Sequence, residues 1–270
     1  MIRDITLGQF YPSDSVIHRI DARVKIIATL IYIIALFVVN SFIGFAFVAV
    51  VLGCIVKASK VPLSYILKGL KPIFFILIFT FVLNIFMMDG QVLFKVWIFS
   101  VTKEGLIKAV FMAIRLVLLI IGSSLLTLTT TPISLTDGIE YLLKPFEKIG
   151  FPAHELAMMM TIALRFIPTL LEETDKIMKA QQARGADFET GNIIRRAKQL
   201  IPILVPLFIS AFRIAHDMAM AMEARCYRGG ENRTRMNAMA FKKGDIVASI
   251  LTVVFMGIII GLRFVIKAYI

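Results

Sequence analysis

Two arginines stand in the same local sequence pattern, which makes them the first candidates for a function. The first copy is AQQARG over residues 180–185 and the second is AMEARC over residues 221–226, with 41 residues from Arg184 to Arg225. Two alanines at i and i+3 share one helix face and add little bulk, so another protein can approach the backbone closely. An arginine beside them supplies a permanently charged fork for a carboxylate or for backbone carbonyls. The pattern predicts two docking tips, formed by Ala183, Arg184 and Gly185 and by Ala224, Arg225 and Cys226.

The same pattern also has a purely structural interpretation. An arginine in the last helical turn followed by a small residue is a common helix ending, stabilised by the helix macrodipole and by a left-handed cap. A single copy would favour that interpretation. Two copies, on two long amphipathic helices, favour docking.

Other polar residues do not form an arrangement typical of catalysis or metal binding. His18, His154 and His216 are scattered without H-x-x-x-H or H-E-x-x-H spacing, and the two cysteines lie far apart. The sequence has no G-x-x-x-x-G-K-[ST] phosphate loop. We therefore predict no catalytic residue, no cofactor site and no metal site.

Arg115 is the candidate for a different function. It lies inside a predicted membrane span, two turns from Lys108, and a self-sufficient permease or channel could use it to hold an anion. In the competing interpretation, these cations reach the membrane surface or pair with a polar group such as Asn84. The structural interpretation is favoured because the predicted spans contain no complementary acid.

The composition excludes an ordinary soluble domain. Hydrophobic residues make up 59% of the 270 positions, charged residues 18%, and the mean hydropathy is +0.85. Soluble domains are nearer half apolar and a quarter charged. We predict an all-α, multi-pass protein of the plasma membrane, with about five transmembrane helices plus long cytoplasmic amphipathic helices.

Four apolar stretches give the five spans. Three are single helices, at residues 73–88, 106–128 and 246–266. The stretch 26–56 would make a straight helix of roughly 46 Å, longer than the hydrocarbon core of about 30 Å. Because Asn40 and Ser41 are the polar pair inside it, we predict a hairpin of two short helices, with Lys25 and Lys57 snorkelling at its ends.

Charge predicts the orientation. The loop 57–72 carries Lys57, Lys60, Lys68 and Lys71 and no acid, which indicates the cytoplasmic side. The hairpin then places the basic amino terminus on that side as well. The loop 89–105 is predicted to be external, and so is the carboxyl terminus.

The stretch between the fourth and fifth spans is dense in charge. It contains a short amphipathic piece, 134–148, and two long helical patterns, Pro152–Arg184 and Asn192–Arg225, which we interpret as arms that pack together at one end and carry charged tips at the other. Their apolar windows are short for spans, so the stretch is predicted to be cytoplasmic, although seven spans remain possible. The predicted organisation is a membrane part at 1–130, a coupling region at 131–244 and a last transmembrane helix at 245–270.

Together these features resemble one known family, the T component (EcfT) of energy-coupling factor transporters. The resemblance covers essentially the whole chain. It rests on Ala183-Arg184-Gly185, on Ala224-Arg225-Cys226 continued by Tyr227-Arg228-Gly229, and on the basic segment His18–Lys25. Two departures are Ala22, where proline is usual, and Cys226, where Gly, Ser or Ala is usual.

The resemblance implies a non-catalytic coupling subunit. The tips would seat in grooves of two ABC ATPase subunits, and the membrane part would hold a separate S component that binds a vitamin or metal. The Met-rich stretches 158–160 and 218–222 would form part of a sliding platform for the S component. The basic tail is a candidate for anionic lipid headgroups, and we expect no nucleic acid; its members are Arg225, Arg228, Arg233, Arg235, Lys242 and Lys243.

Overall fold

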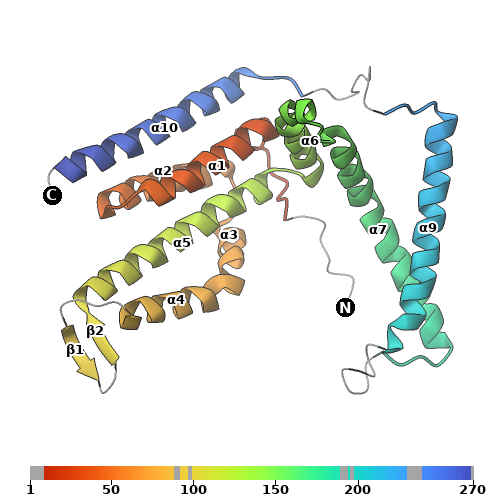
Figure 1. The fold of residues 1–270 in the computed structure, drawn as a ribbon, viewed down its shortest axis with the longest axis horizontal. Coiled ribbons are helices and arrows are strands. Elements are labelled where there is room, and N and C mark those ends of the chain that lie inside the picture. Colours follow the sequence, from red (N-terminus) through yellow and green to blue (C-terminus); the bar gives the residue numbers. More distant parts are fainter. Residues whose placement is uncertain are drawn as a thin grey trace. The chain divides into compact units, whose positions relative to one another are not determined.

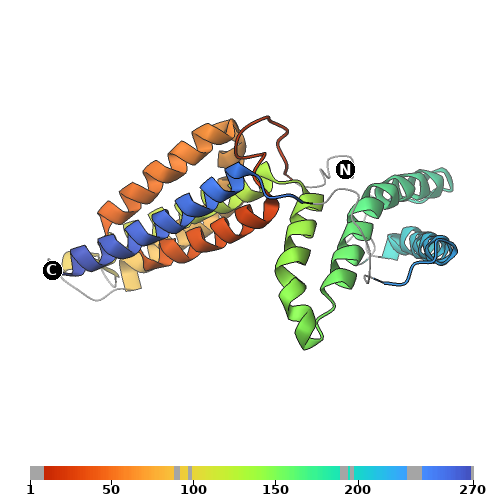
Figure 2. The same cartoon turned by 90° about the horizontal axis from the view of Figure 1, so that it is seen from above.

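The computed structural model describes residues 9–87, 92–96, 99–188, 194, 198–229 and 239–268. The chain separates into two compact units. One contains residues 8–138 and 238–270, and the other contains the stretch 139–237. Figures 1 and 2 show the elements of each unit from two directions.

The first unit is built from the predicted membrane helices. Its elements are α1 (Ala22–Val38), α2 (Phe42–Ser59), α3 (Leu63–Leu70), α4 (Phe74–Met87), β1 (Val92–Val96), β2 (Phe99–Thr102), α5 (Lys103–Thr129), the start of α6 (Pro132–Leu143) and α10 (Lys243–Ala268). The helix α5 contacts α1, α2, α3 and α4, while α10 packs on α1. The predicted all-α membrane fold is confirmed. The antiparallel strands β1 and β2, which lie in the predicted loop 89–105, were not predicted from the sequence.

The predicted hairpin in the first long apolar stretch is confirmed. The helix α1 ends at Val38 and α2 begins at Phe42, so the chain breaks at Val39–Ser41. Ser41 caps α2, because its hydroxyl accepts a hydrogen bond from the backbone N–H of Gly44 at 3.1 Å.

Arg115 of the neighbouring helix α5 binds the backbone at this break. Its Nη2 donates a hydrogen bond of 2.9 Å to the carbonyl of Val39, which has left the α1 ladder. Its guanidinium also lies 5.7 Å from the ring centroids of Phe37 and Phe45. Asn84 is not its partner, since that amide donates to the carbonyl of Thr80. The intramembrane arginine therefore has a partner within the protein.

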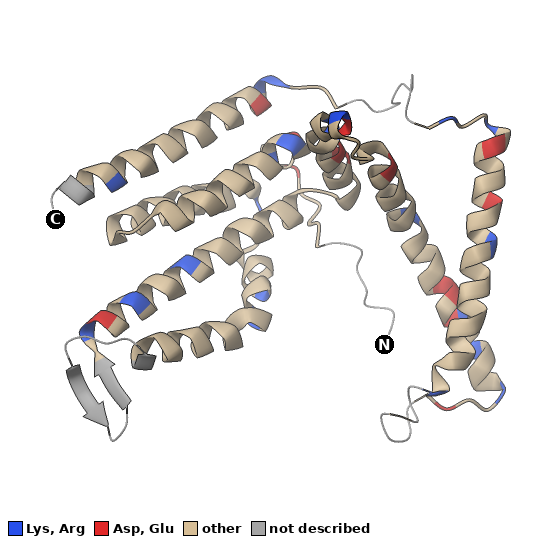
Figure 3. Cartoon of the chain, viewed as in Figure 1, with Lys and Arg blue, Asp and Glu red and all other residues tan. Residues whose placement is uncertain are grey.

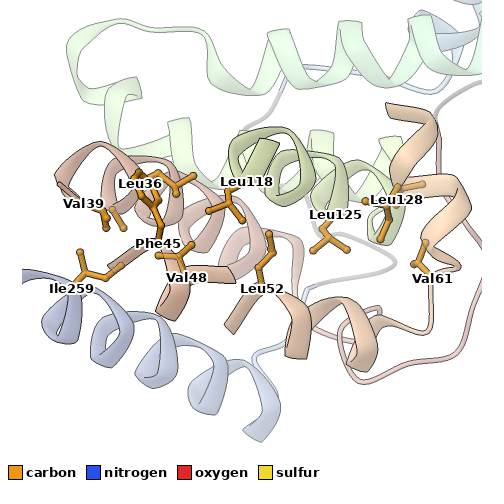
Figure 4. Close-up of a cluster of buried hydrophobic side chains, with 12 residues drawn as sticks. Leu36, Val39, Phe45, Val48, Leu52, Val61, Leu118, Leu125, Leu128 and Ile259 are labelled. Carbon is orange, nitrogen blue, oxygen red and sulfur yellow. The ribbon is translucent and has the colours of Figure 1, made fainter. Parts of the chain in front are cut away.

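The core of this unit lies where α1, α2, α5 and α10 meet (Figure 4). Leu36, Val48 and Ile259 are almost fully buried there. One contact is tighter than the rest, because a Cβ built on Gly122 of α5 would overlap the ring of Tyr32 of α1. The Tyr32 hydroxyl donates to the carbonyl of Leu118 at 2.8 Å, so α1 and α5 are joined by packing and by a hydrogen bond.

The first turn of α1 and the segment before it bind the end of α5. The N–H of Tyr11 donates to the carbonyl of Leu128 at 2.9 Å, and Lys25 Nζ donates to the carbonyl of Thr129 at 2.8 Å. Both carbonyls belong to the last turn of α5, where a helix leaves acceptors without intrahelical partners. The prediction that Lys25 snorkels is wrong, because its side chain is buried against this helix end.

A buried cluster of charged side chains ties the start of α1 to the start of α10. Arg23 and Asp21 form a salt bridge of 2.8 Å with both side chains 5% exposed. Asp245 accepts hydrogen bonds of 2.7 Å from the backbone N–H groups of Asp21 and Lys242. One carboxylate thus holds the starts of both helices.

Six helical stretches are long and apolar enough to cross a membrane by length and composition, among the described residues. They include α2, the stretch Leu63–Ile85 through α3 and α4, α5 and α10, but also α7 (Ala153–Ala183) and α9 (Ile201–Ala224). The helix α1, with 17 residues, is just shorter than these. Whether α7 and α9 lie in the cytoplasm therefore stays a prediction.

The second unit is formed by the end of α6, a 3₁₀ turn at Lys144–Ile149, and the helices α7 and α9, which pack on each other. The predicted helix from Pro152 to Arg184 is confirmed. The helix α9 begins at Ile201, and the predicted start at Asn192 lies outside the described residues, as do the rest of 189–193 and 195–197. Figure 3 shows charges spread along α7 and α9, whereas α1, α2, α4 and α10 have long uncharged stretches.

Candidate functional site

The first predicted tip is the end of α7. Ala183 is the last helical residue, Arg184 is the C-cap, and Gly185 adopts a left-handed conformation with φ of 88°. The N–H of Gly185 donates to the carbonyl of Gln182 at 2.9 Å, and that of Ala186 donates to the carbonyl of Gln181 at 3.0 Å. These two bonds define a Schellman cap, which satisfies the last carbonyls of the helix.

The second predicted tip, at the end of α9, has the same geometry. Ala224 is the last helical residue, Arg225 is the C-cap, and Cys226 is left-handed with φ of 54°. The N–H of Cys226 donates to the carbonyl of Glu223 at 2.8 Å, and that of Tyr227 donates to the carbonyl of Met222 at 3.0 Å. The repeat seen in the sequence is therefore a repeat of backbone conformation.

This geometry gives a second reason for a small third residue in the motif. The sequence argument required it to be small so that a partner could approach. The structure shows that it must also adopt positive φ, which glycine does without cost and other residues do at about 1 to 2 kcal/mol. The structural interpretation of the motif is thus confirmed for the backbone at both ends.

The cap does not use the arginine side chains. All six tip residues are exposed. Within the described part of the chain, neither the Arg184 nor the Arg225 guanidinium makes a hydrogen bond or an ion pair. The backbone explanation therefore leaves two exposed cations in matching positions, and these remain available for a partner.

The two tips lie at opposite ends of the helix pair. Near the end of α7, Gln181 Nε2 donates to the carbonyl of Pro202 at the start of α9, at 3.3 Å. Near the start of α7, Met158 Sδ accepts a hydrogen bond of 3.0 Å from the Tyr227 hydroxyl, which follows α9. The helices are antiparallel, so Arg184 and Arg225 are separated by about the length of α9, roughly 36 Å. The expectation of arms with both tips at one shared end is wrong.

The outer face of α9 is apolar and exposed. The face towards α7 contains Ile203, Leu207 and Ile214, which are buried or half-buried. A second stripe follows helical spacing on the exposed side: Ile201, Leu204, Val205, Phe208, Ile209 and Phe212. Sequence reasoning identified this window as a short apolar segment but did not separate its two faces.

The Met-rich stretches also contain both exposed methionines and a methionine that contacts the neighbouring helix. Met159, Met160 and Met220 are exposed, whereas Met158 contacts Tyr227. The platform predicted for the S component therefore has exposed methionines on both helices, and one of its predicted members instead joins the helices together.

The structure also describes part of the basic tail and the histidines. Arg228, Lys242 and Lys243 of the basic tail are exposed, while Arg233 and Arg235 lie outside the described residues. His18 is held by the Ser15 hydroxyl at 2.7 Å and the Tyr11 carbonyl at 3.0 Å, and burial lowers its pKa. His154 Nδ1 lies 3.1 Å from Glu140 and links α6 to α7.

Comparison with known proteins covers both tips and the buried Asp21–Arg23 pair. Residues 13–236 match the model of the cobalt transport protein family, CbiQ. The energy-coupling factor transporter transmembrane protein EcfT of Clostridium kluyveri is 63% identical over 256 residues, covering 94% of this chain and 95% of that protein. The EcfT protein of Thermosediminibacter oceani is 58% identical over 251 residues, covering 93% and 95%. That of Bacillus subtilis is 44% identical over 264 residues, covering 97% and 100%. Because the match extends over most of the sequence, the chain belongs to the EcfT family and is a multi-pass transmembrane component of an energy-coupling factor transporter.

Proposed function

We propose that this chain is a non-catalytic coupling subunit, in which Arg184 and Arg225 each anchor one end of the α7 and α9 pair to one ABC ATPase subunit. The observation that carries this proposal is the matching geometry of the two ends. Both present an exposed guanidinium from the C-cap position, and both caps are complete without it. In this proposal, ATP is hydrolysed by the partner subunits.

The antiparallel arrangement supports two separate anchors. Cations roughly 36 Å apart cannot enter one groove, but they suit two subunits placed side by side. The pair is also joined near both ends, by Gln181 with Pro202 and by Tyr227 with Met158. A movement of the ATPase subunits would therefore displace the two helices together rather than one alone.

The exposed stripe of α9 supports a contact with a separate S component that binds the vitamin or metal. Six large apolar side chains on one helix face make a surface that another apolar surface can cover. Exposed methionines beside it add a flexible contact that can adapt to different partners. In our proposal the α7 and α9 pair lies on the cytoplasmic side and tilts the S component when the ATPases close.

The proposal is tested by reversing the charge at both tips. Arg184→Glu combined with Arg225→Glu should leave the chain in the membrane but abolish copurification with the ATPase subunits, since a lost interfacial charge contact costs about 2 to 5 kcal/mol. Arg165→Glu combined with Arg213→Glu is the matched control, because both arginines are exposed near the middle of the same two helices. Unchanged assembly and transport in the tip variant would refute the proposal.

A further inference from the structure

Four lysines lie around the short helix α3, between the end of α2 and the start of α4. Figure 3 shows blue and no red on α3. Lys57 lies in the last turn of α2 and Lys60 is its C-cap, and the N–H of Lys60 donates to the carbonyl of Lys57. Lys68 and Lys71 lie one helical turn apart at the end of α3. We call Lys57, Lys60, Lys68 and Lys71 the α3 lysine surface, and all four side chains are exposed.

Lys60 adopts a backbone conformation that favours glycine. Its φ is 58°, in the left-handed region, which costs a residue with a side chain about 1 to 2 kcal/mol. Buried neighbours fix the turn, because the Ser59 hydroxyl donates to the carbonyl of Val56 at 2.7 Å and Ser13 donates to the carbonyl of Ser59 at 3.2 Å. A lysine at a strained backbone position indicates that its side chain has a role other than stabilising the fold.

The helix α3 has one face against the protein and one face outside it. Ile66 is buried, and a Cβ on Gly69 would lie 3.1 Å from the Ser124 hydroxyl of α5. On the other side, Leu63 is 64% and Leu67 56% exposed, and Lys68 Nζ lies 4.9 Å from the centroid of the Tyr65 ring. Apolar side chains beside lysines and a tyrosine are typical of a helix lying at a membrane surface.

The next helix, α4, begins with exposed aromatic side chains. Phe74 and Phe75, within four residues of Lys71, are 61% and 78% exposed at the start of the predicted span. Lysines directly before a span are typical of the headgroup level of a membrane. An acidic protein surface would pair with the lysines but would leave the adjacent leucines and phenylalanines uncovered, which disfavours a protein partner.

The charge of this surface is not neutralised nearby in sequence. Residues 57–72 contain no acid. Asp14, whose charge Lys60 also reaches, is already held by Arg19 through hydrogen bonds of 2.8 and 2.7 Å. We propose that the α3 lysine surface binds the headgroups of anionic phospholipids. This inference is independent of the proposed coupling function.

The test compares lipid selection by the purified full chain in nanodiscs that contain equal amounts of phosphatidylglycerol and phosphatidylcholine. The ratio of the two lipids retained on the protein is measured by native mass spectrometry. Lys60→Gln combined with Lys68→Gln should lower the preference for phosphatidylglycerol by about 10- to 30-fold, since each cation near an anionic surface contributes about fivefold. Lys60→Arg combined with Lys68→Arg, which keeps the charge, should retain the preference.

The matched control is Lys103→Gln combined with Lys108→Gln, which removes the same charge from exposed positions at the start of α5. It should select lipid as the parent does. An equal loss in this control, or an unchanged ratio in the Lys60 and Lys68 variant, would overturn the proposal. It would also be overturned if that variant lost copurifying protein subunits while its lipid ratio stayed the same.

Discussion

Gly185 and Cys226 occupy the same position of the same helix cap, with φ of 88° and 54°. Each follows an arginine at the C-cap, and each donates its N–H to the carbonyl three residues earlier. The two helix ends therefore share a backbone conformation that suits Gly185 better than Cys226. This difference leads to the first prediction.

Replacing Cys226 by glycine should stabilise the protein by about 1 kcal/mol, because glycine adopts positive φ without steric cost. Gly185→Ala should destabilise it by a similar amount for the same reason. Thermal unfolding of the purified chain in detergent measures both. Cys226→Ala is the control and should change little, since alanine keeps the strain. A Gly185→Ala protein as stable as its parent would contradict the assigned cap.

Gly122→Ala should destabilise the first unit by about 1 to 3 kcal/mol, because the added methyl group would overlap the Tyr32 ring. Gly53→Ala is the control, since a Cβ there meets no atom within 4 Å. Thermal unfolding should separate the two variants clearly. If they behave alike, the close approach of α1 to α5 does not contribute to stability.

The Asp21 carboxylate should make the free energy of unfolding depend on pH. Hydrogen bonds from Arg23 hold the pKa of the Asp21 carboxyl below its ordinary value. Its contribution is therefore complete above the unfolded pKa of about 3.9 and is lost as the pH falls through the folded value. Asp21→Asn should cost about 1 to 3 kcal/mol at pH 7, and this difference should shrink at acid pH. Denaturant unfolding in detergent across pH measures it.

Asp14 provides the control for this experiment. It pairs with Arg19 at 2.7 Å, but both side chains are more than two-thirds exposed, and such surface pairs contribute little to stability. Asp14→Asn should therefore leave the unfolding free energy nearly unchanged at every pH. An Asp21→Asn difference that stays constant between neutral and acid pH would contradict the role of the Asp21 charge.

Arg115→Leu should lower stability by about 1.5 to 3 kcal/mol, because the Val39 carbonyl loses a charged hydrogen-bond donor. The purified parent chain, reconstituted alone in liposomes, should show no substrate flux. Thermal unfolding and a flux assay check the two statements. Flux through the parent chain that Arg115→Leu abolishes would instead favour a self-sufficient permease.

Local pattern was enough to predict most of the helices. An apolar run of sufficient length has few alternatives in a bilayer, so the helices α4, α5 and α10 lie close to their predicted bounds. The break at Asn40–Ser41 was predictable as well, because one continuous helix would have exceeded the thickness of the membrane. The motif at Arg184 and Arg225 was visible because a repeated pattern needs no knowledge of the fold.

The tertiary structure decided the features that depend on contacts between distant residues. The sequence could not show that α9 returns antiparallel to α7, which places the two tips at opposite ends. It could not show that Lys25 is buried, because the Thr129 carbonyl that accepts from Lys25 is 104 positions away. Hydrophobic periodicity reports which side of a helix is covered, whereas the identity of the covering residue follows from packing across the whole chain.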